Sequence, residues 1–85
     1  MKVRKKSDTV DAWYYDEESR HHIIRILDEH RQEFMPFGKG IILFTKDGEL
    51  LISPGDYLIK GKMGNFYNCK EDVFNANYEI VTETQ

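Results

Sequence analysis

The sequence predicts an α+β fold, namely a small bent antiparallel sheet of about five or six strands with one amphipathic helix packed on it and a one-turn helix before the last strand. Three observations predict this class. Apolar residues recur with helical spacing in one stretch, residues 16–34. Elsewhere the apolar runs are short, and several alternate as strands do. These runs are separated by Asp47-Gly48 and Pro54-Gly55, two dipeptides that favour tight turns.

The first strand is predicted at residues 9–15, where the side chains alternate between two faces. The two faces are Val10, Ala12 and Tyr14 on one side and Asp11, Trp13 and Tyr15 on the other. Because the second face is both acidic and aromatic, we expect this strand to be only partly covered and to lie near an edge of the sheet.

The amphipathic helix is predicted to begin at Asp16 and to run to about Arg31. The carboxylate of Asp16 can accept hydrogen bonds from free backbone N–H groups of the first turn, and the two glutamates that follow complement the positive end of the helix dipole. The residues with 3–4 spacing, which we expect to form the buried stripe, are Ile23, Ile26, Leu27, His30 and Phe34.

The stretch after the helix is predicted to be a connection at residues 35–40 and then a strand at Ile41–Phe44. This strand is a continuous apolar run, which is typical of a central strand covered on both faces. Asp47 and Gly48 then supply the two central residues of a type I′ hairpin turn, which requires positive φ at both positions. The resulting register pairs Lys46 with Glu49, Phe44 with Leu51 and Leu43 with Ile52.

The C-terminal part is predicted to start with a type II turn at Ser53–Asp56, because proline occupies the second position and glycine the third. The remaining elements are a strand at 57–60, a glycine loop at 61–64, a strand at 65–68, a short helix at 70–76 and a strand at 78–82. In the short helix we expect Val73 and Phe74 to point inward.

Length and charge predict one small domain, residues 1–85, with a basic flexible start at 1–7 and a frayed tail at 83–85. The chain has 12 basic and 15 acidic residues, a net charge of −3. Four of the bases lie in the first seven residues, and without them eight bases face fifteen acids, a net charge of −7. We therefore expect no direct nucleic-acid binding, because that binding depends on neutralising phosphates.

The cysteine count and the apolar runs bear on the compartment. A single cysteine, Cys69, excludes an internal disulfide. No apolar run approaches the length of a membrane span, and the basic start is not followed by the apolar core of a signal peptide. These features predict a reducing, cytoplasmic setting without membrane contact.

A distinctive order of residues extends from Pro54 to Glu79. The positions that carry it are Pro54, Gly55, Asp56, Tyr57, Ile59, Gly61, Gly64, Phe66, Tyr67, Cys69, Lys70, Asp72, Val73, Phe74, Tyr78 and Glu79. On these residues, and on the opening Val3-Arg4-Lys5-Lys6, the chain resembles a family of small, largely uncharacterised proteins encoded in bacteriophages and prophages. The resemblance implies a phage accessory protein acting in the cytoplasm of a bacterial host, and it implies no catalytic residue.

Cys69 and the histidines His21, His22 and His30 are the residues that could bind zinc, because thiolate and imidazole are its preferred ligands. Neighbouring histidines on a helix point about 100° apart, however, and the sequence has no local Cys-x-x-Cys or His-x-x-x-His spacing. We therefore expect no cofactor, with zinc as the alternative. We also expect no enzymatic activity, since no orienting base is identifiable for Cys69.

Candidate partner-binding residues come from the aromatic content, which is five Phe, five Tyr and one Trp. They are Trp13, Tyr15, Tyr57, Phe66 and Tyr67, with the lysines Lys60, Lys62 and Lys70 beside them. Aromatic side chains near a surface often anchor protein interfaces. Together with the small size, the acidic charge and the phage setting that the resemblance implies, these residues give the first hypothesis, a non-enzymatic protein that binds a host protein, such as an anti-CRISPR inhibitor of a defence nuclease.

Two alternatives remain open at this point. One is a protein that sequesters a nucleotide signal with the three lysines and the aromatic residues, and the other is a structural or assembly component of the phage. The sequence does not predict the partner's identity or the oligomeric state.

Overall fold

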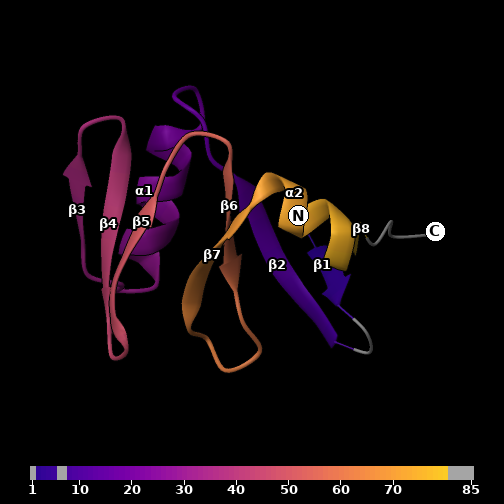
Figure 1. The fold of residues 1–85 in the computed structure, drawn as a ribbon. Coiled ribbons are helices and arrows are strands. Elements are labelled where there is room, and N and C mark those ends of the chain that lie inside the picture. Colours follow the sequence, from indigo (N-terminus) through magenta and orange to yellow (C-terminus); the bar gives the residue numbers. More distant parts are fainter. Residues whose placement is uncertain (1, 6–7, 81–85) are drawn as a thin grey trace.

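The computed structural model describes residues 2–5 and 8–80, and this part of the chain contains eight strands and two helices (Figure 1). In chain order they are β1 (Lys2–Lys5), β2 (Asp8–Tyr14), α1 (Arg20–Glu29), β3 (Phe34–Phe37), β4 (Gly40–Thr45), β5 (Gly48–Ile52), β6 (Asp56–Lys60), β7 (Phe66–Lys70), α2 (Glu71–Asn77) and β8 (Glu79–Ile80). The predicted α+β class is confirmed.

The strands form two antiparallel sheets instead of the single bent sheet that we expected. The larger sheet has the order β7-β6-β2-β1-β8, and the smaller one has the order β3-β4-β5. In Figure 1 the smaller sheet lies at the left with α1 behind it, whereas α2 and β8 lie at the right. Strand β2 is the middle strand of five, so the prediction that it lies near an edge is wrong.

The basic start of the chain is also different from the prediction. Residues Lys2–Lys5 form strand β1, which pairs with β2 on one side and with β8 on the other. Its Val3 is fully buried and lies opposite both Val10 and Ile80. This burial explains why a segment rich in lysine is ordered here. The rest of the predicted flexible start, residues 1 and 6–7, and the predicted tail at 83–85 lie outside the described residues.

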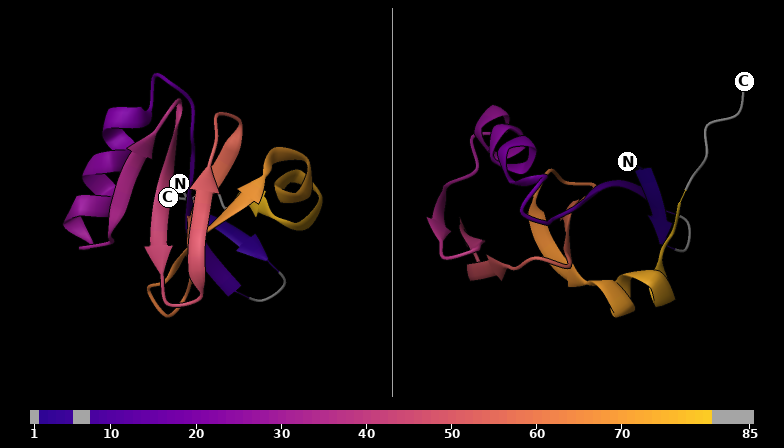
Figure 2. Two further views of the ribbon diagram at one scale, coloured as in Figure 1. Left: turned by 60° about the vertical axis from the view of Figure 1, so that its left-hand side comes forward. Right: turned by 90° about the horizontal axis from the view of Figure 1, so that it is seen from above.

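Two hydrophobic cores lie on opposite faces of the larger sheet. Figure 2 shows the elements beside it, with α1 and the smaller sheet in one part of the molecule and α2 in another. The neighbours Leu58 and Ile59 in β6 show the division, because Leu58 belongs to the first core and Ile59 to the second. The first core is enclosed by α1, the inner face of the smaller sheet and strands β2, β6 and β7; the second lies under α2. The predicted alternation of residues 10–15 between two faces is confirmed by this arrangement.

Helix α1 begins one turn later than predicted, although Asp16 does cap the preceding turn. Its carboxylate accepts the N–H of Ser19 at 2.7 Å, and the Ser19 hydroxyl accepts the N–H of Asp16 at 3.0 Å. In the predicted stripe Ile23, Ile26 and Leu27 are buried.

Helix α1 ends before the other two residues of the predicted stripe, His30 and Phe34. Arg31 has φ 57°, and the N–H of Gln32 donates to the carbonyl of Leu27 at 2.9 Å, which ends the helix. His30 is therefore the exposed C-cap, and Phe34 belongs to β3.

The β4–β5 hairpin has a register two residues away from the predicted one. Phe44 lies opposite Glu49, and Thr45 lies opposite Gly48. Gly48 has φ 122°, but Asp47 does not have positive φ, so the type I′ turn that requires both cannot form. The Thr45 hydroxyl instead accepts the N–H of Asp47 at 3.2 Å and donates to the carbonyl of Gly48 at 2.7 Å.

Two further predictions for local structure have different outcomes. The turn at Pro54-Gly55 is confirmed, since the N–H of Asp56 donates to the carbonyl of Ser53 at 2.9 Å and Gly55 has φ 98°. In α2 only Phe74 is buried, whereas Val73 is 48% exposed, so the prediction that both point inward is wrong. A helix of seven residues that packs along one side buries few positions.

Candidate protein-binding surface

The smaller sheet has one buried face and one open face. On the inner face Ile41, Leu43 and Ile52 are fully buried in the first core. The opposite side is not covered by any helix or strand of the described chain (Figure 2). The prediction that residues 41–44 are covered on both faces is therefore wrong, because β4 is central within its sheet but packs against the core on one side only.

The open face, which we call the outer face, carries large apolar side chains from all three strands. Its apolar residues are Met35, Phe37, Ile42, Phe44 and Leu51, and its charged residues are Glu33 and Glu49. Phe37 is 57% exposed, Met35 and Leu51 are 46% exposed, and Phe44 is 36% exposed. Contiguous exposed apolar residues of this kind mark interaction sites, whereas isolated ones are ordinary.

The residues of the outer face form rows across the strands. Glu33, Phe44 and Glu49 make the first row, because the N–H of Phe44 donates to the carbonyl of Glu33 at 3.0 Å and Phe44 is paired with Glu49. Met35, Ile42 and Leu51 make the second row, and Phe37 lies beyond it. The face thus has an aromatic ring between two carboxylates at one end and an apolar surface over the rest.

Gly40 allows the three strands to approach closely at the far end of this face. A Cβ atom at this position would collide with the carbonyl oxygen of Ile52 in β5. Gly40 also lies opposite Phe37 and contributes no side chain of its own, and Cδ1 of Leu51 lies 3.2 Å from where a Cβ of residue 40 would be. The large exposure of Phe37 follows from this arrangement.

The free edge of the smaller sheet is less suited to binding than its face. Since residues 33 and 44 form a hydrogen-bonded pair, the N–H groups of Met35 and Phe37 point toward β4 and the intervening positions point outward. One of those outward positions is Pro36, which has no N–H group. Proline at an edge opposes the addition of another strand, so docking on the outer face is favoured over strand addition.

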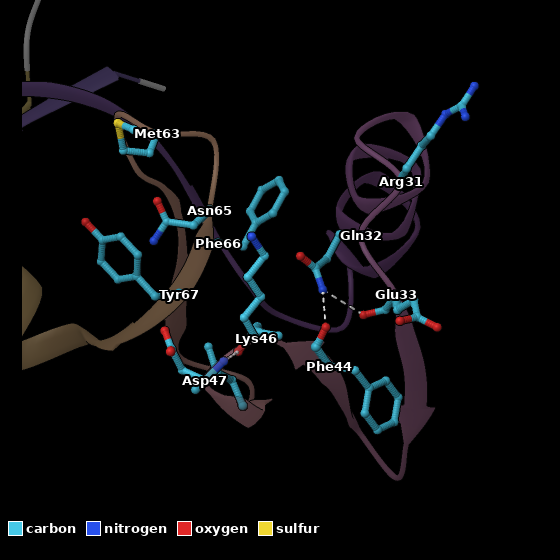
Figure 3. Close-up of a pocket in the computed structure, with 12 residues that line it drawn as sticks. Arg31, Gln32, Glu33, Phe44, Lys46, Asp47, Met63, Asn65, Phe66 and Tyr67 are labelled. Atoms are coloured by element: carbon cyan, nitrogen blue, oxygen red, sulfur yellow. Dashed lines mark hydrogen bonds between the residues drawn. The ribbon is translucent and has the colours of Figure 1, made fainter.

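A groove of about 850 Å³ adjoins this sheet on its inner side (Figure 3). It lies between the end of α1, the β4–β5 turn and the β6–β7 loop. In Figure 3 Lys46 points into the groove toward Phe66, while the ring of Phe44 points away from it. Gln32 donates from Nε2 to the carbonyl oxygens of Glu33 and Phe44, at 3.0 and 2.9 Å. Neither His30 nor Cys69 lines the groove.

The eight residues predicted to bind a partner do not come together on one surface. Tyr15 is fully buried and Phe66 is 4% exposed, so the prediction that these two anchor a partner is wrong. The Tyr15 hydroxyl donates to the carbonyl of Lys39 at 2.6 Å, which makes it part of the core. Trp13 packs against the first core, whereas Tyr57 and Tyr67 pack against the second.

The three predicted lysines are also separated. Lys70 pairs with Asp56 at 3.5 Å, and the Nζ atom of Lys60 lies 3.5 Å from Nε2 of His30. Lys62 is exposed in the β6–β7 loop. Lys70 thus lies at the opposite end of the β6–β7 pair from Lys60, because Lys70 is paired with Asp56 and Lys60 with Phe66.

Tyrosines and one phenylalanine form a stack over the second core. The rings of Tyr57 and Phe74 are 3.7 Å apart and nearly parallel, and Tyr78 stacks on Phe74 at 5.1 Å. The hydroxyls of Tyr67 and Tyr78 lie 3.2 Å apart. Burial, together with the hydrogen bond to Tyr67, raises the pKa of Tyr78 above its ordinary value of 10.0. The stack closes the core beneath α2.

The candidate zinc ligands are on different sides of the larger sheet. Cys69 packs against the second core, and the His30 ring lies against Phe66 of the first core at 5.5 Å. Within residues 2–5 and 8–80 no group of three His, Cys, Asp or Glu side chains is close enough together to hold a metal ion.

The outer face was missed because its signal was ambiguous in the sequence. Met35 and Phe37 lie beside Pro36, which suggested a connection, and the run Ile41–Phe44 gives no indication of which face is open. The pairing of residues 34–37 with 40–43 is the information that would have revealed this surface.

Comparisons with known proteins give no relative for this chain. No protein-family model, no curated protein and no solved structure matches it. Among the described residues, neither helix is long and apolar enough to traverse a lipid bilayer.

Proposed function

We propose that this chain is a non-enzymatic binding protein that docks a partner protein on the outer face of β3-β4-β5. The observation that carries the proposal is the exposure of Met35, Phe37, Phe44 and Leu51 beside one another on three paired strands. Apolar and aromatic side chains in such a patch are the usual anchors of protein interfaces.

The setting that we propose for this activity is the cytoplasm of a bacterial host. The resemblance of residues 54–79 to small phage and prophage proteins supports a phage accessory role. Its target is then a host macromolecule, such as the nuclease of a CRISPR defence system. The net charge of −3 also supports a protein target, because an acidic chain can occupy a groove that normally holds nucleic acid.

The test compares three versions of the full chain. The double substitution Phe44→Ser with Leu51→Ser removes two anchors of the outer face, and Val73→Ser removes an exposed apolar side chain on α2 as the matched control. Each version is immobilised and exposed to lysate of the bacterium that carries the gene, and recovered proteins are quantified by mass spectrometry.

The expected result is one protein recovered in stoichiometric amounts by the wild type and by Val73→Ser, but not by the double variant. Circular dichroism and urea unfolding establish that the double variant is folded. Equal recovery by all three versions would show that the outer face is not the binding surface. The recovered protein is then purified, and its activity is measured with and without the wild-type chain.

A further inference from the structure

We infer that the outer face recognises a basic, amphipathic segment of its partner, with an arginine or lysine placed over Phe44 between Glu33 and Glu49. This inference rests on the proposed function and adds the chemistry of the partner. It is carried by the first row of the outer face, in which Phe44 lies between Glu33, the residue just before β3, and Glu49 in β5.

The spacing of this row suits one cation. Neighbouring strands lie about 4.8 Å apart, so the two glutamates flank Phe44 at about that distance on either side. A guanidinium or ammonium group above an aromatic ring is attracted by the ring's electron-rich face. From that position it can also bond a carboxylate, and charge-assisted hydrogen bonds are the stronger kind.

Among the residues that the structure describes, neither carboxylate has a cationic partner. Glu33 and Glu49 are exposed and form no ion pair within the described residues, whereas Asp11, Glu17 and Asp56 each pair with a lysine. The nearby Lys46 lines the groove together with Glu33 and Phe44, but its side chain points toward Phe66 and away from the Phe44 ring (Figure 3). The negative charge of the row is therefore left for a partner to neutralise.

The rest of the outer face requires that the partner be apolar as well. The row of Met35, Ile42 and Leu51 lies two residues along each strand from the first row, which is about 6.8 Å. A cation and an apolar side chain reach the two rows together when they are two residues apart in an extended segment or four apart on a helix. Such a segment carries the cation and the apolar side chain on the same face, with one residue between them when it is extended and three when it is helical.

A second copy of this chain is a poorer occupant of the same face. The charged side chains on the face itself are both glutamates, so two copies packed face to face would bury four carboxylates without a matching cation. Burying unpaired charge opposes association. Strand addition is opposed by Pro36 at the free edge.

The test uses a short fluorescein-labelled peptide that contains Arg-Ser-Leu-Ser-Leu, so that leucines follow the arginine by two and by four residues. Two matched peptides carry glutamate for arginine or serine for leucine. Fluorescence anisotropy measures the dissociation constant of each peptide with the full chain at low and high salt. The test variant is Glu33→Gln with Glu49→Gln. Its control, Glu18→Gln with Glu71→Gln, makes the same charge change at exposed positions on or beside the helices.

We expect the arginine–leucine peptide to bind the wild type and the control alike, and the test variant to bind it about tenfold to a hundredfold more weakly. Both matched peptides should bind weakly. High salt should weaken binding of the arginine–leucine peptide more for the wild type than for the test variant. Equal weakening in test variant and control would overturn the inference, since it would indicate unspecific attraction to an acidic protein. Failure of the wild type to bind the peptide would overturn it too.

Two more outcomes separate this inference from the proposed function. If the peptide does not bind but Phe44→Ser with Leu51→Ser still abolishes recovery of the host protein, the outer face binds a partner that is not basic, so the inference is wrong and the proposed function stands. If sedimentation at micromolar concentration shows that the wild type is a dimer and that this double variant is a monomer, the occupant is a second copy and the inference is wrong.

Discussion

Asp56 and Ser53 are joined by two hydrogen bonds across the turn that leads from the smaller sheet into the larger one. The N–H of Asp56 donates to the carbonyl of Ser53, and the N–H of Ser53 donates to the carboxylate of Asp56, both at 2.9 Å. Asp56 is 3% exposed, and its own carbonyl accepts the N–H of Tyr15. This one residue therefore connects the turn with Tyr15, which directly follows β2, and with Ser53, which directly follows β5.

Replacement of Asp56 by alanine is expected to lower the free energy of unfolding by about 1–3 kcal/mol, because the N–H of Ser53 is left without its acceptor. Asp56→Asn retains an oxygen that can accept a hydrogen bond from this N–H, so it should lower the free energy of unfolding by less. Lys70→Ala should cost about 1 kcal/mol or less, since Lys70 is exposed and its ion pair with Asp56 is screened by water. Urea unfolding followed by circular dichroism measures all three. A loss for Lys70→Ala as large as for Asp56→Ala would contradict this ranking.

Arg31→Gly is expected to stabilise the protein. Arg31 has φ 57°, a left-handed conformation that costs a residue with a side chain about 1–2 kcal/mol. Glycine removes this cost but gives the unfolded chain more freedom, so the net gain in free energy of unfolding is about 0.5–1 kcal/mol. Arg25→Gly, the same substitution inside α1, should instead lower the free energy of unfolding by about 1 kcal/mol. Changes of the same sign in the two variants, measured by urea unfolding, would contradict the role assigned to the helix end.

These local features show how much of the fold could be predicted from the sequence. The Pro54-Gly55 turn and the stripe of Ile23 and Leu27 were predicted because each depends on a few neighbouring residues. The alternation of residues 10–15 was predicted for the same reason.

The features that were not predicted depend on pairing between distant segments. Pro36 indicated a connection, although proline is compatible with the free edge of a sheet, where its missing N–H is not needed. The basic start forms β1 because Val3 is buried between two partner strands, one of them near the other end of the chain. The outer face follows from that same kind of pairing, so the sequence pointed to aromatic residues that the structure places in the cores.

Stability should decrease in alkaline solution, in part through Tyr78. Burial and the hydrogen bond to Tyr67 raise the pKa of Tyr78 above the ordinary value of 10.0. Below that value the hydroxyl is protonated in both states and its contribution is fully present. As the pH rises above it, the unfolded chain loses its proton first, so the free energy of unfolding falls until the folded state ionises as well.

Tyr78→Phe is therefore expected to make the free energy of unfolding less dependent on pH above 10.0. Some dependence should remain, because burial also raises the pKa values of Tyr15 and Tyr57. Tyr14→Phe removes a hydroxyl from a side chain that is 38% exposed and is the matched control. Urea unfolding at a series of pH values provides the measurement. An alkaline decrease that is as steep in Tyr78→Phe as in the wild type would show that Tyr78 does not contribute.

The difference between the two faces of the smaller sheet gives the last prediction. Leu43 in β4 is fully buried in the first core, whereas Leu51 in β5 is 46% exposed on the outer face. Leu43→Ala should lower the free energy of unfolding by about 2–5 kcal/mol, because it removes buried methyl groups and leaves a cavity. Leu51→Ala should lower it by about 1 kcal/mol or less, since nearly half of this residue's surface is already in water. Equal losses in urea unfolding would mean that the outer face is covered in solution.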